Sequence, residues 1–320
     1  MTSRLANARR LYPEDRVALR ELGLRDGLQL TKTFPSTPAK IEWIEKAHGA
    51  GVRHFEVGSF LPVRTFPQFA DIRTLIRTVD GLDGAFSSAL TLNEHAIADS
   101  LETPVDEIVV ALSATEEHCM SNIRRSRRSA IGLLSHAVGE RKGSDRPLIN
   151  ASISVSFGCS VGGEVAPEEV LRLAEACAEA GAEVIGIADT VGFAGPRQVR
   201  ELCELVLPRV HPLPVIIHLH DTRGTGIANA YAALQAGVRV LDGTLGGLGG
   251  CPFAPGATGN VAFEDLVYLC ERSGFATGID LEKLLELRPI LDRELPGETL
   301  YGALARAGPP ATIRWQSGST

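Results

Sequence analysis

The sequence predicts an α/β fold of the (β/α)₈ barrel type, with extra helices at its C-terminal end. Short apolar segments rich in β-branched residues alternate eight times with segments of helical period, over about 260 residues. The 33 glycines among 320 residues suit the many tight turns that this alternation requires. Hydrophobic residues make up 44% of the chain and provide a substantial core. A doubly wound open sheet is the alternative interpretation of the same alternation.

The predicted strands are short runs in which apolar and β-branched residues lie between turn residues. They cover residues 16–24, 54–60, 84–90, 107–114, 148–155, 183–189, 215–221 and 240–247. We expect the first strand to lead into a loop at residues 25–29. We also expect a polar loop after the fourth strand.

The predicted helices are longer runs with apolar residues three and four positions apart. They cover residues 39–52, 67–79, 93–105, 126–139, 168–182, 196–210, 230–238 and 262–275, with two further stretches at 280–292 and 297–306. Ser36 is suited to cap the first helix, and Pro38 lies near its first turn. Pro167 and Pro196 open two later helices in the same way.

Composition limits the domain organisation and the class of partner. We expect an N-terminal extension at residues 1–15, a single catalytic barrel domain at 16–306 and a flexible tail at 307–320. The net charge of −7 argues against nucleic acid and against an anionic membrane as partners. No apolar run reaches the roughly 18 residues of a transmembrane helix, and the polar start lacks a signal-peptide core. The six cysteines form no CxxC pair, which favours reduced thiols and a cytoplasmic location.

The segment VIIHLHD, residues 215–221, ends in two histidines. Because side chains alternate across a strand, His218 and His220 point to the same side. Two imidazoles at one strand end are suited to chelate a metal ion. The alternative is a pair of histidines that only form hydrogen bonds in a core.

Polar side chains also follow the other predicted strands, where a (β/α)₈ barrel places its active site. An aspartate with two histidines suits Mg²⁺ or Mn²⁺, with zinc as a further option. Asp26 is the candidate aspartate, and its alternative role is a turn cap. The polar residues at the strand ends are Arg25, Asp26, Gln29, Glu56, Ser59, Ser154, Ser156, Asp189, Thr190, His218, His220, Asp221, Cys251 and Asn260.

Three motifs resemble the 3-hydroxy-3-methylglutaryl-CoA lyase family, which belongs to a superfamily of metal-dependent acyl-CoA lyases and condensing enzymes. They are ELGLRDGLQ at 21–29, HLHDTRGTGIANAYAALQAGV at 218–238 and GGLGGCPFAPGATGNVAFEDLVYL at 246–269. The resemblance implies a (β/α)₈ barrel, an acyl-CoA substrate, a divalent metal cofactor (Mg²⁺ or Mn²⁺) and a homodimer. The family cleaves its substrate into acetyl-CoA and acetoacetate.

The resemblance also implies roles for individual residues. Asp26, His218 and His220 match the metal ligands, and Asn260 matches their neighbour. Arg25 matches the arginine that stabilises the enolate, and Cys251 matches the catalytic cysteine of a mobile loop. The substrate-binding candidates are Gln29, Glu56, Ser59, Ser154, Asp189 and Thr190.

The reaction implied is a retro-Claisen cleavage, and these residue types suit it. A divalent ion acidifies the 3-hydroxyl, and His218 or a carboxylate at the metal takes its proton. Arg25 donates to the enolate oxygen, and the Cys251 thiol protonates the enolate carbon. The alternative for Cys251 is a buried structural thiol.

Departures from the family pattern concern the substrate more than the chemistry. Asn150 stands where a family arginine enters the fifth strand, and the 157–163 segment differs from the usual LGCPYEG. Arginines at 124, 125, 127 and 128 suit either CoA phosphates or a solvated helix face. Alternative functions are a 4-hydroxy-2-oxo acid aldolase, a Claisen-condensing acyltransferase and a non-catalytic metal-binding scaffold.

Overall fold

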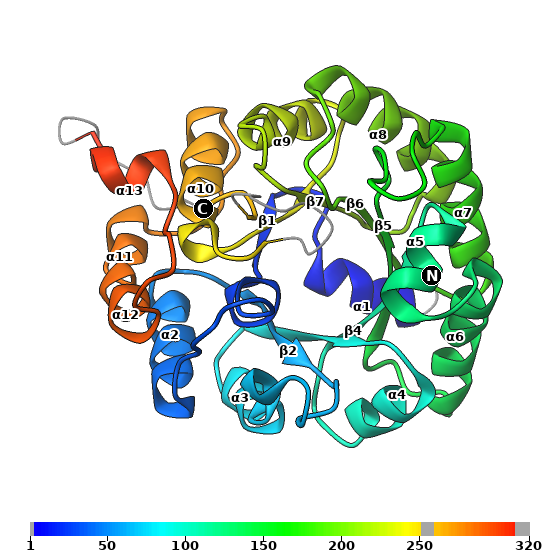
Figure 1. The fold of residues 1–320 in the computed structure, drawn as a ribbon, viewed down its shortest axis with the longest axis horizontal. Coiled ribbons are helices and arrows are strands. Elements are labelled where there is room, and N and C mark those ends of the chain that lie inside the picture. The colour runs from blue at the N-terminus through cyan, green and yellow to red at the C-terminus, as the bar shows by residue number, and fades with distance from the viewer. Residues whose placement is uncertain (1–2, 251–258, 311–320) are drawn as a thin grey trace.

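Eight parallel strands close into a barrel, with each strand hydrogen-bonded to the next and β8 to β1. The structure is a computed structural model, and it describes residues 3–250 and 259–310. Figure 1 looks into the ring of strands, with helices around it. The predicted (β/α)₈ barrel is therefore confirmed. The strands are β1 Ala18–Glu21, β2 His54–Ser59, β3 Phe86–Thr91, β4 Glu107–Ser113, β5 Leu148–Ser154, β6 Val184–Asp189, β7 Val215–Leu219 and β8 Val240–Gly243.

The helices that connect successive strands form the outer layer (Figure 1). Most bury one apolar face against the strands, as Leu75, Ile76 and Val79 of α3 do. These helices are α2 Thr37–Gly49, α3 Ile72–Asp80, α4 Glu94–Leu101, α5 Glu116–Ile123, α6 Arg127–Glu140, α7 Pro167–Glu179, α8 Pro196–Val210 and α9 Gly226–Gln235. Helix α10 Phe263–Arg272 follows the last strand, β8. The C-terminal helices α11 Leu281–Leu285, α12 Arg288–Glu294 and α13 Ala303–Ala307 pack outside α2 and α10. No helix in the described ranges combines the length and apolar character needed to cross a membrane.

Two segments predicted as loops are helical. The segment after β1 forms the π-helical turn η1 Gly23–Gly27, in which the amides of Arg25, Asp26 and Gly27 all donate to the carbonyl of Leu22. One turn is too short to give a periodic apolar pattern. The polar segment after β4 contains α5, which is capped by Thr115 and has acidic residues in its first turn.

Several predicted elements are shorter than expected, and for three of them glycine or proline positions show why. The predicted strand 240–247 stops at Gly243, because positive φ angles at Gly246 and Gly247 turn the chain into the 3₁₀ turn η3 Leu245–Gly247. The predicted helix 280–292 divides into α11 and α12, with Pro289 in the first turn of α12. The predicted helix 297–306 is reduced to α13, which follows Gly302 at a φ of 107°.

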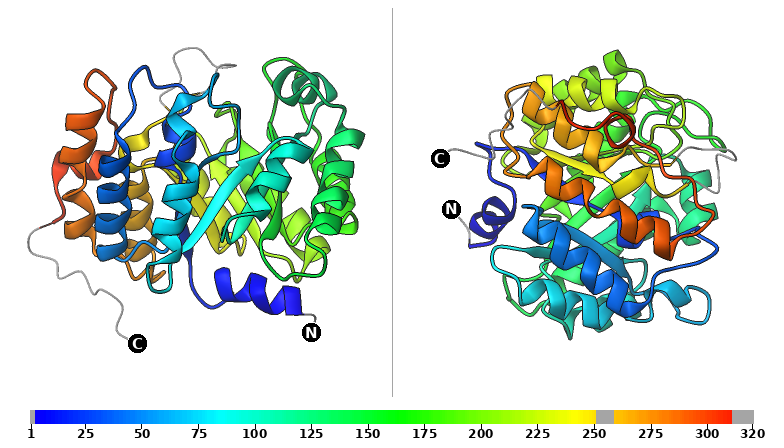
Figure 2. Two further views of the ribbon diagram at one scale, coloured as in Figure 1. Left: turned by 90° about the horizontal axis from the view of Figure 1, so that it is seen from below. Right: turned by 90° about the vertical axis from the view of Figure 1, so that its left-hand side faces the viewer.

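Helix α1, Ser3–Leu11, lies across the end of the barrel opposite the candidate site (Figure 2, left). Ala8, Leu11 and Tyr12 pack against inward-facing residues at the N-terminal ends of the strands, including Ala18 and Val240. This contact keeps water away from the lowest layer of the barrel interior.

A buried ionic layer lies above this apolar layer. The Arg20 guanidinium is 3.2 Å from a carboxylate oxygen of Glu107 and 3.3 Å from one of Asp242. Tyr12 donates a 2.7 Å hydrogen bond to Glu107, and Asn150 donates to its other oxygen at 2.9 Å. These charges can remain buried because each has partners of opposite charge or hydrogen-bond donors.

His54 leads to a prediction on stability. Its buried ring stacks between Tyr12 and Phe86, at 5.2 Å from each ring, and burial lowers its pKa to about 3 from an ordinary 6.5. Between these values the unfolded chain binds one proton more, so the stability present at neutral pH is lost as pH falls below about 6.5. We expect His54→Phe, which preserves the stack, to reduce this loss by up to about 1.4 kcal/mol per pH unit.

Urea unfolding of the parent and the variant at pH 7, 6 and 5 measures the effect. His95 lies on α4 with an 88% exposed side chain, so His95→Gln is the matched control. Equal pH dependence in the parent and His54→Phe would contradict the assignment.

Candidate active site

Asp26, His218 and His220 meet at the C-terminal end of the barrel. Their candidate ligand atoms all lie within 4.8 Å of one another. The two histidine Nε2 atoms are 3.1 Å apart, and His220 Nε2 is 3.8 Å from an Asp26 carboxylate oxygen. His218 lies on β7 and His220 follows it directly, paired with Asn260, and the turn η1 brings Asp26 to them from the end of β1. The predicted ligand set is therefore assembled from two neighbouring parts of the barrel mouth.

Arg25 is fixed beside this cluster by two carboxylates. Its guanidinium is 2.6 Å from Asp26 and 2.9 Å from Glu56 on β2. Although burial opposes ionisation, Arg25 and the two histidines hold the pKa of Asp26 well below its usual range. Burial raises the pKa of Glu56, with Arg25 opposing this effect. The arginine fork thus lies next to the candidate metal ligands with little freedom to move.

Asp242 on β8 orients His218. Its carboxylate lies 3.2 Å from His218 Nδ1, which leaves Nε2 directed toward Asp26 and His220. Burial alone lowers the pKa of His218, but the hydrogen bond to Asp242 and the charge of Asp26 raise it overall. For His220, burial and the neighbouring His218 lower the pKa to about 4. His220 is therefore neutral near pH 7, as a metal ligand must be.

Asn260 completes the cluster and supports its fit to a divalent ion. Its amide donates to the Asp26 carboxylate and to the carbonyl of Leu248, which is 3.1 Å away. Its buried side-chain oxygen has no hydrogen-bond partner among the residues that the structure describes. One carboxylate, two imidazoles and an amide oxygen form a donor set suited to Mn²⁺ or Mg²⁺. The residues present therefore fit the metal expected from the sequence.

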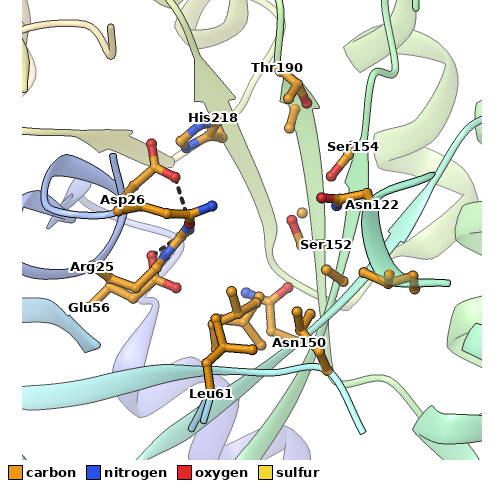
Figure 3. Close-up of a pocket in the computed structure, with 18 of the residues that line it drawn as sticks. Arg25, Asp26, Glu56, Leu61, Asn122, Asn150, Ser152, Ser154, Thr190 and His218 are labelled. Atoms are coloured by element: carbon orange, nitrogen blue, oxygen red, sulfur yellow. Dashed lines mark hydrogen bonds and ion pairs between the residues drawn. The ribbon is translucent and has the colours of Figure 1, made fainter. Parts of the chain in front are cut away.

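The cluster opens into a cavity of about 1170 Å³ at the barrel mouth. Figure 3 shows Arg25, Asp26, Glu56 and His218 on one side of this cavity, facing Ser152, Ser154 and Thr190 on the other. The predicted site residues that line it are Arg25, Asp26, Gln29, Glu56, Ser154, Thr190, His218 and His220.

Other predicted site residues lie elsewhere. Ser59 does not line the cavity, because its hydroxyl donates to the carbonyl of Leu90 between two strands. Asp189 lies between Ala188 and Thr190, which line the cavity, and its own side chain points away from it. Its carboxylate accepts hydrogen bonds from the backbone amides of Phe193 and Ala194. Cys251 lies outside the described residues, although the preceding Gly250 lines the cavity.

Sequence reasoning did not identify the support beneath the ligands. Asp242, Arg20 and Glu107 form an ionic chain that reaches His218 from the barrel interior. The sequence did contain a sign of this support, because each of three otherwise apolar strands carries one charged residue at an inward-facing position. Only the register of the closed barrel indicates that these positions face one another.

The fold and the ligand cluster define a barrel enzyme with a candidate metal centre. Residues 16–291 match the HMGL-like family. The chain is 36% identical to hydroxymethylglutaryl-CoA lyase of Bacillus subtilis, over 89% of this chain and 94% of the relative. It is 37% identical to (R)-citramalyl-CoA lyase of Chloroflexus aurantiacus, over 92% and 95%. An Acinetobacter baumannii HMG-CoA lyase structure with coenzyme A and 3-methylmalate matches with a TM-score of 0.87 and 33% identity, covering 94% and 98%.

The chain belongs to the HMGL-like family and is a carbon–carbon lyase. Several solved structures of lower identity share the fold alone. One is the carboxyl transferase domain of Rhizobium etli pyruvate carboxylase, at 16% identity and a TM-score of 0.68.

The role of Asp242 is testable through metal affinity. Asp242→Asn removes the negative charge that orients His218, and loss of such a partner typically weakens metal binding about 10–100-fold. We expect a decrease of that size for Mn²⁺ in calorimetry, and a larger one for His220→Ala, which loses a ligand. Ser88→Ala is the control, because it removes another contact of Arg20 without touching His218. An Asp242→Asn affinity within about threefold of the parent would exclude this role.

Proposed function

We propose that the protein is a divalent-metal-dependent lyase that cleaves a 3-hydroxyacyl-CoA, such as 3-hydroxy-3-methylglutaryl-CoA, into acetyl-CoA and an oxo product. The convergence of Asp26, His218 and His220 beside Arg25 is the observation that carries the proposal. The names of the relatives support a CoA thioester as the substrate. The cavity supports it as well, because it extends from this cluster to the barrel mouth.

Asp26, His218 and His220 would hold the ion, with Asn260 beside them. When bound, Mg²⁺ or Mn²⁺ supplies Lewis-acid polarisation of the substrate oxygens. The 3-hydroxyl loses its proton to His218 or to a neighbouring carboxylate. The C2–C3 electron pair then passes to the thioester as an enolate, and C3 becomes a carbonyl.

Arg25 is the group suited to stabilise the enolate oxygen. Its planar fork is already oriented by Glu56 and Asp26, so little reorganisation accompanies the reaction. We propose that the Cys251 thiol delivers the proton to C2, which completes acetyl-CoA. The overall reaction moves one proton from the hydroxyl to C2 and requires no oxidant or reductant.

The acyl group is the open part of this proposal. The two relatives of similar identity carry different names, hydroxymethylglutaryl-CoA lyase and (R)-citramalyl-CoA lyase. Asn150 and Ser152 give the β5 side of the cavity uncharged side chains. We therefore propose that 3-hydroxy-3-methylglutaryl-CoA is a poorer substrate than another 3-hydroxyacyl-CoA.

Acetyl-CoA release tests the function. Purified protein with Mn²⁺ is incubated with a panel of 3-hydroxyacyl-CoA esters, with and without a chelator. We expect release that the chelator abolishes, and a decrease in kcat of about 10²–10⁴-fold for Cys251→Ser, since serine is a far weaker acid. Absence of release from every ester would refute the lyase proposal. A near-parental kcat for Cys251→Ser would remove that residue from the mechanism.

The proposed role of Arg25 gives a separate prediction. Lysine retains the charge but loses the planar fork that reaches Asp26 and Glu56. We expect Arg25→Lys to lower kcat about 10²–10³-fold, as removal of an oxyanion donor typically does. Mn²⁺ affinity, measured by calorimetry, is expected to remain close to the parental value. A variant with parental kcat would show that Arg25 does not stabilise the transition state.

A further inference from the structure

The cavity has an apolar wall that the proposed chemistry does not use. The wall consists of Leu90 and Leu92 from the β3 segment and Val109 and Ala111 from β4, and all four line the cavity. They form a small cluster separate from the main core, in which Leu90, Val109 and Ala111 are at least 91% buried. Leu90 and Val109 are register partners, so the wall is continuous across the two strands.

The wall lies across the barrel from the candidate metal ligands. In a closed ring of eight strands, β3 is opposite β7 and β4 is opposite β8. His218 comes from β7, and its partner Asp242 comes from β8. A substrate held by its 3-hydroxyl at the ligands would therefore direct one substituent of C3 toward the wall.

Charge pairing argues against an anion at this wall. The arginines lining the described part of the cavity are Arg20, Arg25, Arg124 and Arg125. Arg20 and Arg25 each pair with two carboxylates, and Arg125 pairs with Glu94. Arg124 is exposed. Three of the four arginines are therefore already neutralised by carboxylates, and the fourth is solvated. A carboxylate placed against the wall would lose its hydration in exchange for little new pairing, which is unfavourable.

The CoA arm is a poor occupant of the wall. It carries amide groups that require hydrogen-bond partners, whereas the four side chains are hydrocarbon. It must also leave through the barrel mouth, while Leu90, Val109 and Ala111 are nearly fully buried. An apolar group attached close to the reacting carbon fits the position better than the arm does.

We propose that the wall binds an uncharged alkyl substituent, longer than methyl, on C3 of the 3-hydroxyacyl-CoA substrate. This inference rests on the proposed lyase function. The C2–C3 bond breaks, the hydroxyl proton ends on C2, and the alkyl group leaves on the new carbonyl product. The products are acetyl-CoA and a ketone or oxo acid that carries the alkyl chain.

A set of esters with increasing alkyl chain length, called the ladder below, tests the proposal. Two series of 3-hydroxyacyl-CoA esters carry methyl, propyl or pentyl on C3, with either carboxymethyl or methyl as the other substituent. Within a series only the alkyl length changes, so a carboxylate at the metal affects all its members equally. In the series that is cleaved, we expect kcat/KM to rise at least tenfold from methyl to the best longer chain, since one methylene in an apolar pocket changes it about 10–200-fold.

Two substitutions in the wall are expected to act in opposite directions. Ala111→Leu fills the space and should lower kcat/KM for pentyl at least tenfold more than for methyl. Val109→Ala enlarges the space and should move the preference toward the longer chain. Ser129→Ala, on α6 in the lining of the same cavity but outside the wall, is the control and should leave the order of the ladder unchanged. Calorimetry with Mn²⁺ should give parental affinity for all three variants.

The outcomes separate this inference from the lyase proposal. If no ester is cleaved, the lyase proposal is wrong. If esters are cleaved but kcat/KM is flat or falls with chain length, the lyase proposal stands and the alkyl site is refuted. If kcat/KM rises with chain length in the parent but Ala111→Leu does not reduce this rise, the assignment of the wall as the alkyl site is also wrong.

Discussion

The buried pairing of Arg20 with Glu107 and Asp242 is the interaction on which the rest of the barrel interior depends. Charges inside a barrel are stable only when each has a partner of opposite charge or a hydrogen-bond donor, so these side chains have few alternative positions. Glu107 connects them to Tyr12 below, and Asp242 connects them to His218 above. The helix that closes the bottom of the barrel is therefore linked to a candidate metal ligand through three ionic side chains.

Similar charge pairing holds the side chains of the candidate site in place before any substrate binds. Asp26 faces Arg25 on one side and the two histidines on the other, and Glu56 holds the far side of the same guanidinium. Fixed dipoles and charges of this kind lower the cost of reorganisation during a reaction. The geometry of the candidate site is thus a consequence of charge pairing among residues of β1, β2, β7 and β8 and of the turns that follow them.

The remaining strands, β3 to β6, line the cavity with uncharged side chains. Strands β5 and β6 line it with small side chains such as Ser152, Gly186 and Ala188, and β3 and β4 add apolar ones such as Leu90 and Val109. The carboxylates and histidines that β1, β2, β7 and β8 bring to the cavity thus lie on one side of it, and the proposed alkyl site lies on the other. This division is typical of a fold whose reactive groups and specificity groups come from different strand ends.

The sequence by itself determined the alternation of strands and helices, because strand and helix periods are local, and it put His218 and His220 on one face through their two-residue spacing. Closure of the eight strands into a barrel was the favoured interpretation, which the pairing of β8 with β1 confirms. Asp26 and Arg25 could be predicted from their motif and the strand they follow. Only the tertiary structure decided that Asp189 turns away from the cavity, that Asp242 supports His218, and that Leu90 and Val109 form one wall. These facts depend on strand register and on contacts between residues far apart in the chain, which no local pattern of residue types records.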